Sequence, residues 1–286
     1  MEPVWIAKKT SRALVRQYCL PRKPDTHKGN YGRILIIAGA EGYTGAPALA
    51  AKAAVRSGAG LIFLGVPRAV YPIVASKLDA PVVFPLADGD GKLSSAALPE
   101  ILRRLETTNA CLLGPGLGRG EETDHVVRKI VSRCTCPLVL DADGINAMAA
   151  HKDILREAGC PLILTPHEGE FRRLTDAPET DRVSGAMNLA RELNAIVLRK
   201  GHETVITDGF MTYVNHTGNP GMATGGSGDV LAGILVSMLG QGVPPLEAAA
   251  LSAWLHGSAG DLAAAELGQY AMGPNDLIDN LPRLLP

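Results

Sequence analysis

Short apolar runs alternate with longer helix-like runs along most of the chain. Arg33–Ala38 is a solid apolar run, and the Ala-rich stretch Ala46–Ser57 has the pattern of a helix that Gly58 closes. Solid apolar runs are typical of strands buried on both faces of a parallel sheet. The other predicted strands are Leu61–Val66, Val82–Leu86, Ala110–Leu113, Leu138–Leu140, Leu162–Leu164 and Ala195–Leu198. The other predicted helices are Ser95–Glu106 with Ser94 as its N-cap, Glu121–Arg133, Ile145–His151, Ala186–Leu193, Asp229–Leu239 and Pro245–Leu267.

This alternation predicts an α/β fold, a three-layer αβα sandwich with a mostly parallel sheet whose two faces are covered by helices. Thr204–Val214 departs from the pattern, because two β-rich arms flank Asp208 and Gly209, which is a hairpin signal. No linker, composition shift or internal repeat divides the sequence. We therefore expect residues 1–286 to form a single domain.

Composition and charge exclude several classes of protein. Hydrophobic residues make up 46% and charged residues 20% of 286 residues, which is a globular balance. The net charge of −1 is too small to attract a phosphate backbone, so nucleic acid is not an expected partner. The longest uncharged stretch, Val230–Leu246, has 17 residues interrupted by Gly and Pro, and the N-terminal residues lack the continuous apolar segment of a signal peptide. We expect a soluble, cytoplasmic protein without a membrane segment.

The five cysteines do not form the pattern of a disulfide framework. They occur at positions 19, 111, 134, 136 and 160. This scatter fits a reducing cytosol. Cys134 and Cys136 have no second Cys or His pair at zinc spacing, so we favour thiols over a metal site there and expect no protein-bound transition metal.

Unusual residues follow the predicted strands at their carboxyl ends, where ligands bind in open α/β sheets. The segments are Gly39–Gly42, Gly114–Gly118, Asp141–Gly144, Thr165–Glu170 and Lys200–Thr204. A single Gly-containing turn means little, but five of them at one edge of a sheet predict a site.

The most informative segment is Gly218–Asp229, which contains five glycines and leads directly into an apolar helix. Backbone N–H groups and the helix dipole make such a turn a natural phosphate site. The spacing differs from the Walker motif, because no Lys-Ser/Thr pair follows the last glycine. Asp229 has a simpler interpretation as a favourable charge at the helix dipole. Its place beside an anion site favours instead a carboxylate that acts on a substrate proton.

Six stretches in order resemble one family. They are residues 27–51, 112–118, 140–147, 164–171, 198–204 and 219–234, and the last contains Gly225-Gly226-Ser227-Gly228-Asp229. This signature is similar to the anion hole and catalytic Asp of the ribokinase-like superfamily. Over most of residues 27–260 the chain resembles the ADP/ATP-dependent (S)-NAD(P)H-hydrate dehydratases.

The resemblance implies a lyase that restores NADH and NADPH from their hydrated forms. It consumes ADP or ATP by phosphorylating the ring hydroxyl and eliminating phosphate. Asp229 is then the catalytic base. The implied contacts to hydrated NAD(P)H are Ala46, Gly116, His167 and Asp229. The implied contacts to ADP or ATP are Lys200, Gly201, His202, Glu203, Thr204 and Gly228. The implied anion hole is Gly225, Gly226, Ser227 and Gly228.

Several of these residues also have purely structural interpretations. His167 replaces the Asn that related kinases carry at this point, and such a His could bind a phosphate or ribose hydroxyl or could cap a helix. Lys200 could be a solvated lysine in an exposed turn. Ala46 could serve ordinary helix packing.

The resemblance also implies Mg²⁺ carried in with the nucleotide, a separate NAD(P)H-hydrate epimerase as functional partner, and a homotetramer as in some members. It does not decide between ADP and ATP. Two other functions remain open: a ribokinase-like kinase of a small alcohol, such as a thiazole or pyrimidine alcohol, and a non-catalytic adenine-nucleotide sensor. Asp229 and the glycine turn argue against a sensor, which needs no base.

Overall fold

The computed structural model describes residues 7–175 and 181–286, and a ten-stranded sheet runs through it. The strand order is β1-β12-β11-β10-β9-β8-β7-β2-β3-β4. The strands are β1 (Lys8–Lys9), β2 (Arg33–Ile37), β3 (Leu61–Pro67), β4 (Val82–Leu86), β7 (Ala110–Leu113), β8 (Leu138–Leu140), β9 (Leu162–Leu164), β10 (Ile196–Arg199), β11 (Thr204–Thr207) and β12 (Thr212–Asn215). A separate short pair is formed by β5 (Asp88–Gly89) and β6 (Lys92–Leu93).

The sheet is mostly parallel, as the sequence predicts. The neighbours from β4 to β10 all pair in parallel. The pairs β10–β11 and β11–β12 are antiparallel. Strands β11 and β12 form the hairpin that the sequence predicts around Asp208 and Gly209. Parallel strands point their carboxyl ends toward the same edge of the sheet, so the loops that follow them meet there.

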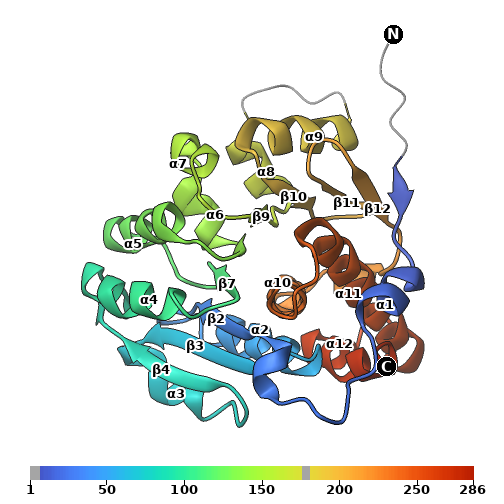
Figure 1. The fold of residues 1–286 in the computed structure, drawn as a ribbon, viewed down its shortest axis with the longest axis horizontal. Coiled ribbons are helices and arrows are strands. Elements are labelled where there is room, and N and C mark those ends of the chain that lie inside the picture. The colour runs from blue at the N-terminus through green and yellow to red at the C-terminus, as the bar shows by residue number, and fades with distance from the viewer. Residues whose placement is uncertain (1–6, 176–180) are drawn as a thin grey trace.

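Helices cover both faces of the sheet (Figure 1). Side chains alternate along β2: Ile34 and Ile36 join one buried cluster, while Leu35 and Ile37 join another. The first cluster includes residues of α1 (Arg12–Tyr18), α2 (Gly45–Arg56), α3 (Tyr71–Ala75), α10 (Ser227–Gly240), α11 (Pro245–Leu267) and α12 (Pro274–Asn280). The second includes residues of α4 (Leu98–Leu105), α5 (Glu121–Arg133), α6 (Asp143–Met148), α7 (Lys152–Arg156), α8 (Glu168–Leu174) and α9 (Arg182–Leu193). This is the predicted three-layer αβα arrangement.

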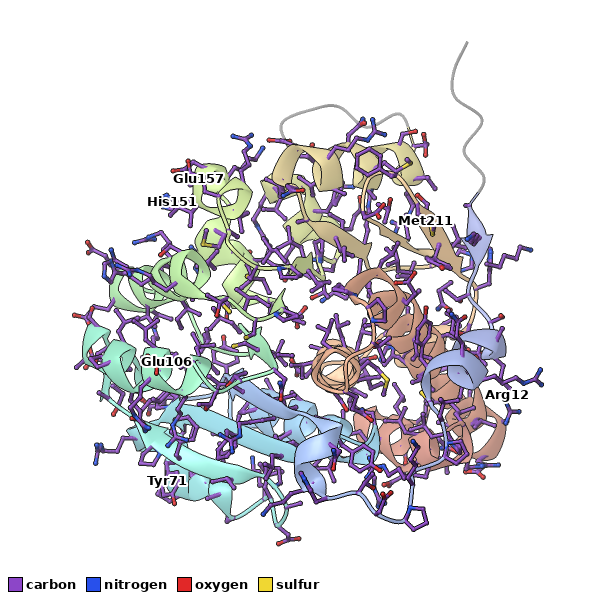
Figure 2. The ribbon with its side chains drawn as sticks, in the orientation of Figure 1. Arg12, Tyr71, Glu106, His151, Glu157 and Met211 are labelled. Atoms are coloured by element: carbon purple, nitrogen blue, oxygen red, sulfur yellow. The ribbon has the colours of Figure 1, made fainter. Side chains whose placement is uncertain are left out.

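The outer surface of these helices is polar. Figure 2 shows charged side chains such as Arg12, Glu106 and Glu157 at the outside of the fold, where they are exposed. In the part of the chain that the structure describes, no helix is both long and apolar enough to cross a membrane.

Helix α10 lies in the middle of the molecule and is in contact with α2, α11 and α12 (Figure 1). Its sequence is apolar on every side, which is typical of a fully enclosed helix. Small residues allow the close approach: a Cβ added at Gly233 would collide with the backbone of Ala50 in α2. Helix α10 therefore packs directly on the backbone of α2.

Three details differ from the sequence expectations. Among the described residues, the side chain of Ser94 makes no capping hydrogen bond, and the next N–H, at Ser95, is bound by Glu122 of α5 at 3.2 Å. The helix expected at Ile145–His151 begins at Asp143 and ends at Met148, because Ala142 adopts φ +50° and starts the helix earlier. Helices α1, α3, α7 and α8 were not among the predicted helices, although helix capping was one interpretation of His167.

Candidate active site

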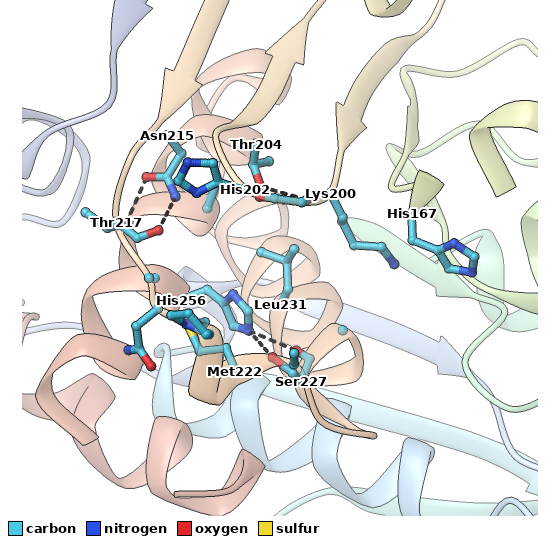
Figure 3. A pocket seen from close by; sticks show the side chains of 18 of the residues that line it. His167, Lys200, His202, Thr204, Asn215, Thr217, Met222, Ser227, Leu231 and His256 are labelled. Carbon is cyan, nitrogen blue, oxygen red and sulfur yellow. Dashed lines mark hydrogen bonds between the residues drawn. The ribbon is translucent and has the colours of Figure 1, made fainter. Parts of the chain in front are cut away.

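A cavity of about 1070 Å³ opens at the carboxyl edge of the sheet (Figure 3). Its walls come from the residues after β9 and β10, from the segment between β12 and α10, and from one side of α11. The predicted residues that line it are His167, Lys200, Gly201, His202, Glu203, Thr204, Gly225, Ser227 and Gly228. The structure thus brings the expected nucleotide turn and most of the expected anion hole into one cavity.

The glycine turn leads into α10 as predicted. Gly226 precedes the helix with φ +96°, a left-handed conformation that favours glycine. A Cβ at this position would also meet the side chain of Leu49 at 2.5 Å. The first N–H groups of a helix lack partners within the helix, and the dipole makes this end positive. The turn can therefore bind a phosphate group.

A cluster of charged side chains surrounds this helix end. The ammonium Nζ of Lys200 lies 2.7 Å from Oδ1 of Asp141 and 4.0 Å from Oε2 of Glu170. A Cβ added at Gly228 would lie 3.6 Å from the same Nζ, so Lys200 reaches the anion turn. Lys200 is therefore not a solvated turn lysine, and that alternative is wrong.

Burial and neighbouring charges change the acidity of the cluster. Burial raises the pKa of Asp229 to about 7, the negative charge of Asp141 adds to this shift, and Lys200 opposes it. Burial also raises the pKa of Glu170. For Lys200, burial lowers the pKa, but Asp141 and Glu170 outweigh it and the net shift is upward. Lys200 therefore stays charged, while Asp229 is poised to take up a proton near neutral pH.

His167 is the N-cap of α8. Its Nδ1 accepts a hydrogen bond from the N–H of Gly169 at 2.9 Å, and Glu170 accepts one from the N–H of His167 at 2.9 Å. The capping interpretation is therefore correct for the structure. The ring also lines the cavity, which leaves a contact to a ligand as a prediction.

The segment Lys200–Thr204 forms a tight turn between β10 and β11. The hydroxyl of Thr204 donates to the carbonyl of Gly201 at 2.9 Å. Glu203 has φ +55° and pairs with His216 at 3.2 Å. These contacts fix a turn whose polar groups face the cavity.

Ala46 and Gly116 lie together, outside the set of described residues that line the cavity. A Cβ added at Gly116 would lie 3.1 Å from Cβ of Ala46 and 2.9 Å from Cβ of Tyr43. Ala46 is near the beginning of α2, and Leu49 of the same helix touches Gly226 at the anion turn. Ala46 and Gly116 therefore lie on the α2 side of the anion turn, and their contact with the hydrated cofactor stays a prediction.

Other cavity residues were not predicted from the sequence. Asn215, His216 and Thr217 extend the wall that begins with the predicted segment at Gly218, and His256 and Gly257 of α11 face the interior. Asp261 of α11 supports that wall by accepting hydrogen bonds from the N–H of Gly218 at 3.0 Å and from the side chain of Asn219 at 3.1 Å. Asn215, His216 and Thr217 lie at the end of the hairpin strand β12, and His256, Gly257 and Asp261 are on a helix, so the rule for ends of the predicted parallel strands did not indicate them.

The sheet, the glycine turn and the aspartate at the start of α10 define a ribokinase-like protein. A ribokinase-like superfamily protein from Enterococcus faecalis V583 has a TM-score of 0.86 to this chain and 25% identity, covering 99% of this chain and 97% of its own.

Residues 34–283 match the family model described as NAD(P)H-hydrate dehydratase, and this chain belongs to that family. A bifunctional NAD(P)H-hydrate repair enzyme from Moorella thermoacetica is 46% identical over 96% of this chain and 54% of its own length. This chain therefore spans about half the length of that relative. The ADP/ATP-dependent NAD(P)H-hydrate dehydratase from Bacillus subtilis, co-crystallised with ATP and Mg²⁺, has a TM-score of 0.82 and 29% identity, covering 97% of each chain.

Proposed function

We propose that this protein is an ADP- or ATP-dependent (S)-NAD(P)H-hydrate dehydratase that restores NADH and NADPH from their hydrated forms. The observation that carries the proposal is the pairing of Asp229 with the anion turn at the start of α10, opposite the ammonium of Lys200. A base, a phosphate site and a fixed cation are the parts that phosphoryl transfer to a hydroxyl requires. The match to the NAD(P)H-hydrate dehydratase family supports the ring hydroxyl of hydrated NADH or NADPH as the group that is phosphorylated.

The chemistry follows from the poor leaving ability of hydroxide. The hydrated ring carries its hydroxyl on the carbon beside the nitrogen. Asp229 accepts the hydroxyl proton while the oxygen attacks the terminal phosphoryl group of the nucleotide, releasing AMP from ADP or ADP from ATP. The N–H groups from Gly225 to Gly228, together with Lys200, stabilise the charge that develops on the phosphoryl oxygens. Phosphate then leaves with the C–O electron pair, pushed by the ring nitrogen, and loss of a proton from the next ring carbon restores the dihydronicotinamide.

The two ligands use different sides of the anion turn. The nucleotide occupies the cavity, with the turn Lys200–Thr204 and Gly228 along it. The hydrated cofactor approaches from the α2 side, where Ala46 and Gly116 carry little or no side chain, and His167 reaches it from the wall of the cavity. This arrangement brings both ligands to Asp229.

Magnesium fits this site as an ion that arrives with the nucleotide. Among residues 7–175 and 181–286, no group of three or more His, Cys, Asp or Glu side chains is arranged to hold a metal. The carboxylate of Asp141 is already paired with Lys200. Mg²⁺ prefers phosphate and water oxygens with one or two carboxylates, and Glu170 and Asp229 are the carboxylates near the phosphate site. The ion supplies charge neutralisation of the phosphates.

The proposal includes the partners expected from the family resemblance. These are hydrated NADH or NADPH, an adenine nucleotide, an NAD(P)H-hydrate epimerase as functional partner, and a homotetrameric assembly that light scattering can check. The similarity of this chain to a bifunctional NAD(P)H-hydrate repair enzyme in Moorella thermoacetica supports the link to a second repair activity.

One assay tests the proposal directly. The protein is incubated with hydrated NADH, Mg²⁺ and either ADP or ATP, and the absorbance of the restored dihydronicotinamide is followed. We expect turnover with nucleotide, release of free phosphate, and no turnover without nucleotide or in EDTA. A stable phosphorylated alcohol, or no restored NADH, would contradict the proposal.

The same assay tests the base. Asp229→Asn should lower turnover by about 10²–10⁴-fold, the usual contribution of a general base. Its nucleotide affinity, measured by calorimetry, should persist or increase because a negative charge near the phosphates is removed. Asp279→Asn, an exposed change on α12, is the matched control and should leave both unchanged. Turnover of Asp229→Asn within a few-fold of wild type would show that this carboxylate only faces the helix dipole.

A further inference from the structure

Helix α11 contributes a histidine that reaches the anion turn. Nε2 of His256 lies 2.9 Å from the backbone carbonyl oxygen of Ser227 and 3.2 Å from its hydroxyl (Figure 3). Ser227 is the first residue of α10, immediately before Gly228 and Asp229. The contact therefore joins two helices at the point where the phosphate site begins.

The protonation of the ring is fixed by its surroundings. Burial lowers the pKa of His256 to about 4, so the imidazole is neutral near neutral pH. A neutral imidazole has a single N–H. Because a carbonyl oxygen can only accept, this hydrogen lies on Nε2 and is donated to Ser227. The carbonyl of Ser227 therefore selects the tautomer of His256 with its hydrogen on Nε2, which is the one that this hydrogen bond needs.

The neighbours of His256 restrict the relative movement of α11 and the cavity wall. Gly257 packs so closely on Thr217 that an added Cβ would collide with it. The hydroxyl of Thr217 also reaches the carbonyl of Trp254 at 3.3 Å. Asp261, further along α11, holds Gly218 and Asn219. Helix α11 thus has separate anchors: Asp261 for the wall formed by residues 215–222, and His256 for the anion turn.

The turn that His256 contacts has few side chains of its own. Gly225, Gly226 and Gly228 carry none, and Gly226 is in the left-handed conformation. Glycine-rich backbone has more conformational freedom than other backbone, so a hydrogen bond that fixes its first helical residue restricts a large set of alternatives. Donors for a phosphoryl group act through their preset orientation, and small displacements reduce the rate strongly.

We propose that His256 is a positioning residue for phosphoryl transfer: by donating to the carbonyl of Ser227, it keeps the N–H groups of the anion turn and the carboxylate of Asp229 aimed at the reacting phosphate. The proposal rests on the proposed function. It assigns His256 an effect on the rate of the bound complex and only a small effect on nucleotide affinity. A direct contact of the ring to the nucleotide would produce the opposite pattern.

The side-chain amides provide a sharp test. The amide nitrogen of Gln extends about as far as Nε2 of His, whereas that of Asn is one bond shorter. His256→Ala and His256→Asn should each lower kcat about tenfold or more, on the scale expected for a displaced catalytic group. The Michaelis constant for nucleotide should stay within about twofold. His256→Gln should recover kcat to within about threefold of wild type, since its N–H can reach Ser227.

Two further measurements make the test decisive. His151→Ala, a change at the start of α7 away from the cavity, is the matched control and should leave kcat and the Michaelis constant unchanged. Hydrogen exchange of the amides of residues 227–230 should accelerate in His256→Ala and His256→Asn but not in His256→Gln. Hydrogen exchange does not depend on turnover. It therefore still tests whether His256 fixes the anion turn if wild type fails to convert hydrated NADH and the proposed function is wrong.

Each other result overturns the proposal. An unchanged kcat in His256→Ala would remove the positioning role. A raised Michaelis constant for nucleotide with unchanged kcat would assign His256 to direct nucleotide binding. Equal kcat values in His256→Gln and His256→Asn would show that the N–H at the Nε2 position does not matter. If His256→Ala does not fold, the Gln and Asn pair carries the comparison.

Discussion

Lys200 is a half-buried lysine whose ammonium group has the carboxylates of Asp141, Glu170 and Asp229 as neighbours. The side chain is 19% exposed, and that of Asp141 is 3% exposed. Buried pairs of this kind contribute little compared with an apolar pair, but removing one partner leaves the other charge without compensation. Lys200 therefore serves both the fold and the site, and the two roles can be separated.

The separation uses a double variant. Lys200→Met should lower the free energy of unfolding by about 3–5 kcal/mol, because Asp141 is left buried and unpaired. Adding Asp141→Asn should recover most of this stability, measured by denaturant unfolding. It should not recover turnover, because the cation beside Gly228 is still missing. A double variant as unstable as Lys200→Met would show that the charge pair is not the cause.

The raised pKa of Asp229 predicts how rate depends on pH. The base must be ionised to accept the hydroxyl proton, and burial raises its pKa to about 7. We expect kcat/KM of the wild type to rise with pH and to level off above about pH 7, since this parameter reports groups of the free enzyme. A rate independent of pH between about 5 and 8 would contradict Asp229 as the base.

The same shift predicts a stability difference of known sign. An ordinary aspartate has a pKa of about 3.9. The folded protein therefore binds more protons at Asp229 than the unfolded chain between about pH 4 and pH 7, and the free energy of unfolding falls as pH rises through this interval. Asp229→Asn has no carboxyl group to ionise at this position, so it does not lose this stability. The Tm of the variant minus the Tm of wild type should therefore be larger at about pH 8 than at about pH 5.

At the scale of elements, the proposed approach of the hydrated cofactor passes the first turn of α2. Ala46 lies in this turn, and its Cβ faces the position of Gly116. Ala46→Leu should raise the Michaelis constant for hydrated cofactor by filling this space, while that for nucleotide stays unchanged, both measured by steady-state kinetics. Arg56→Leu, at the exposed end of the same helix, is the control. A larger effect on nucleotide would reverse the placement of the two ligands.

Gly116 is less suited to this experiment than Ala46. It has φ +61°, a conformation that side chains other than glycine rarely adopt. A valine there would be strained regardless of any ligand, and a loss of activity could come from the fold alone.

Elements with strong hydrophobic patterns could be predicted from the sequence, and short polar ones could not. The range of α11 is the predicted Pro245–Leu267, and the strand at Leu162–Leu164 is also as predicted. Helix α8 was not predicted, because its cap His167 is not one of the residue types preferred at helix starts, and capping was only one interpretation of this residue. Helix α1 has seven residues and β1 has two, which is too short for a periodic pattern to indicate them.

The candidate site was predictable to the extent that it follows strands. Asp141 and Lys200 come directly after β8 and β10, and His167 is three residues after the end of β9, so their meeting follows from the parallel sheet. His256 and Asp261 are on a helix whose sequence reads as apolar packing. Their contacts depend on how α11 lies against the glycine turn, and no local pattern specifies that.

At the scale of the molecule, the order of the strands in the sheet could not be predicted from local sequence patterns. Alternating runs predict parallel pairing, but β2 lies between β7 and β3, and β1 pairs with β12 at the far edge. These neighbours are chosen by the long crossover connections and by burial of both sheet faces. The single-domain organisation stays a prediction, which limited proteolysis can check.

The enclosure of α10 has a consequence for heat inactivation. A helix surrounded by α2, α11 and α12 cannot leave its place unless the packing around it opens. Many enzymes lose activity well below their melting temperature, because a loop that carries the chemistry detaches first. Here the helix that carries Asp229 belongs to the interior itself. Activity should therefore persist on warming until the whole fold gives way in one cooperative transition.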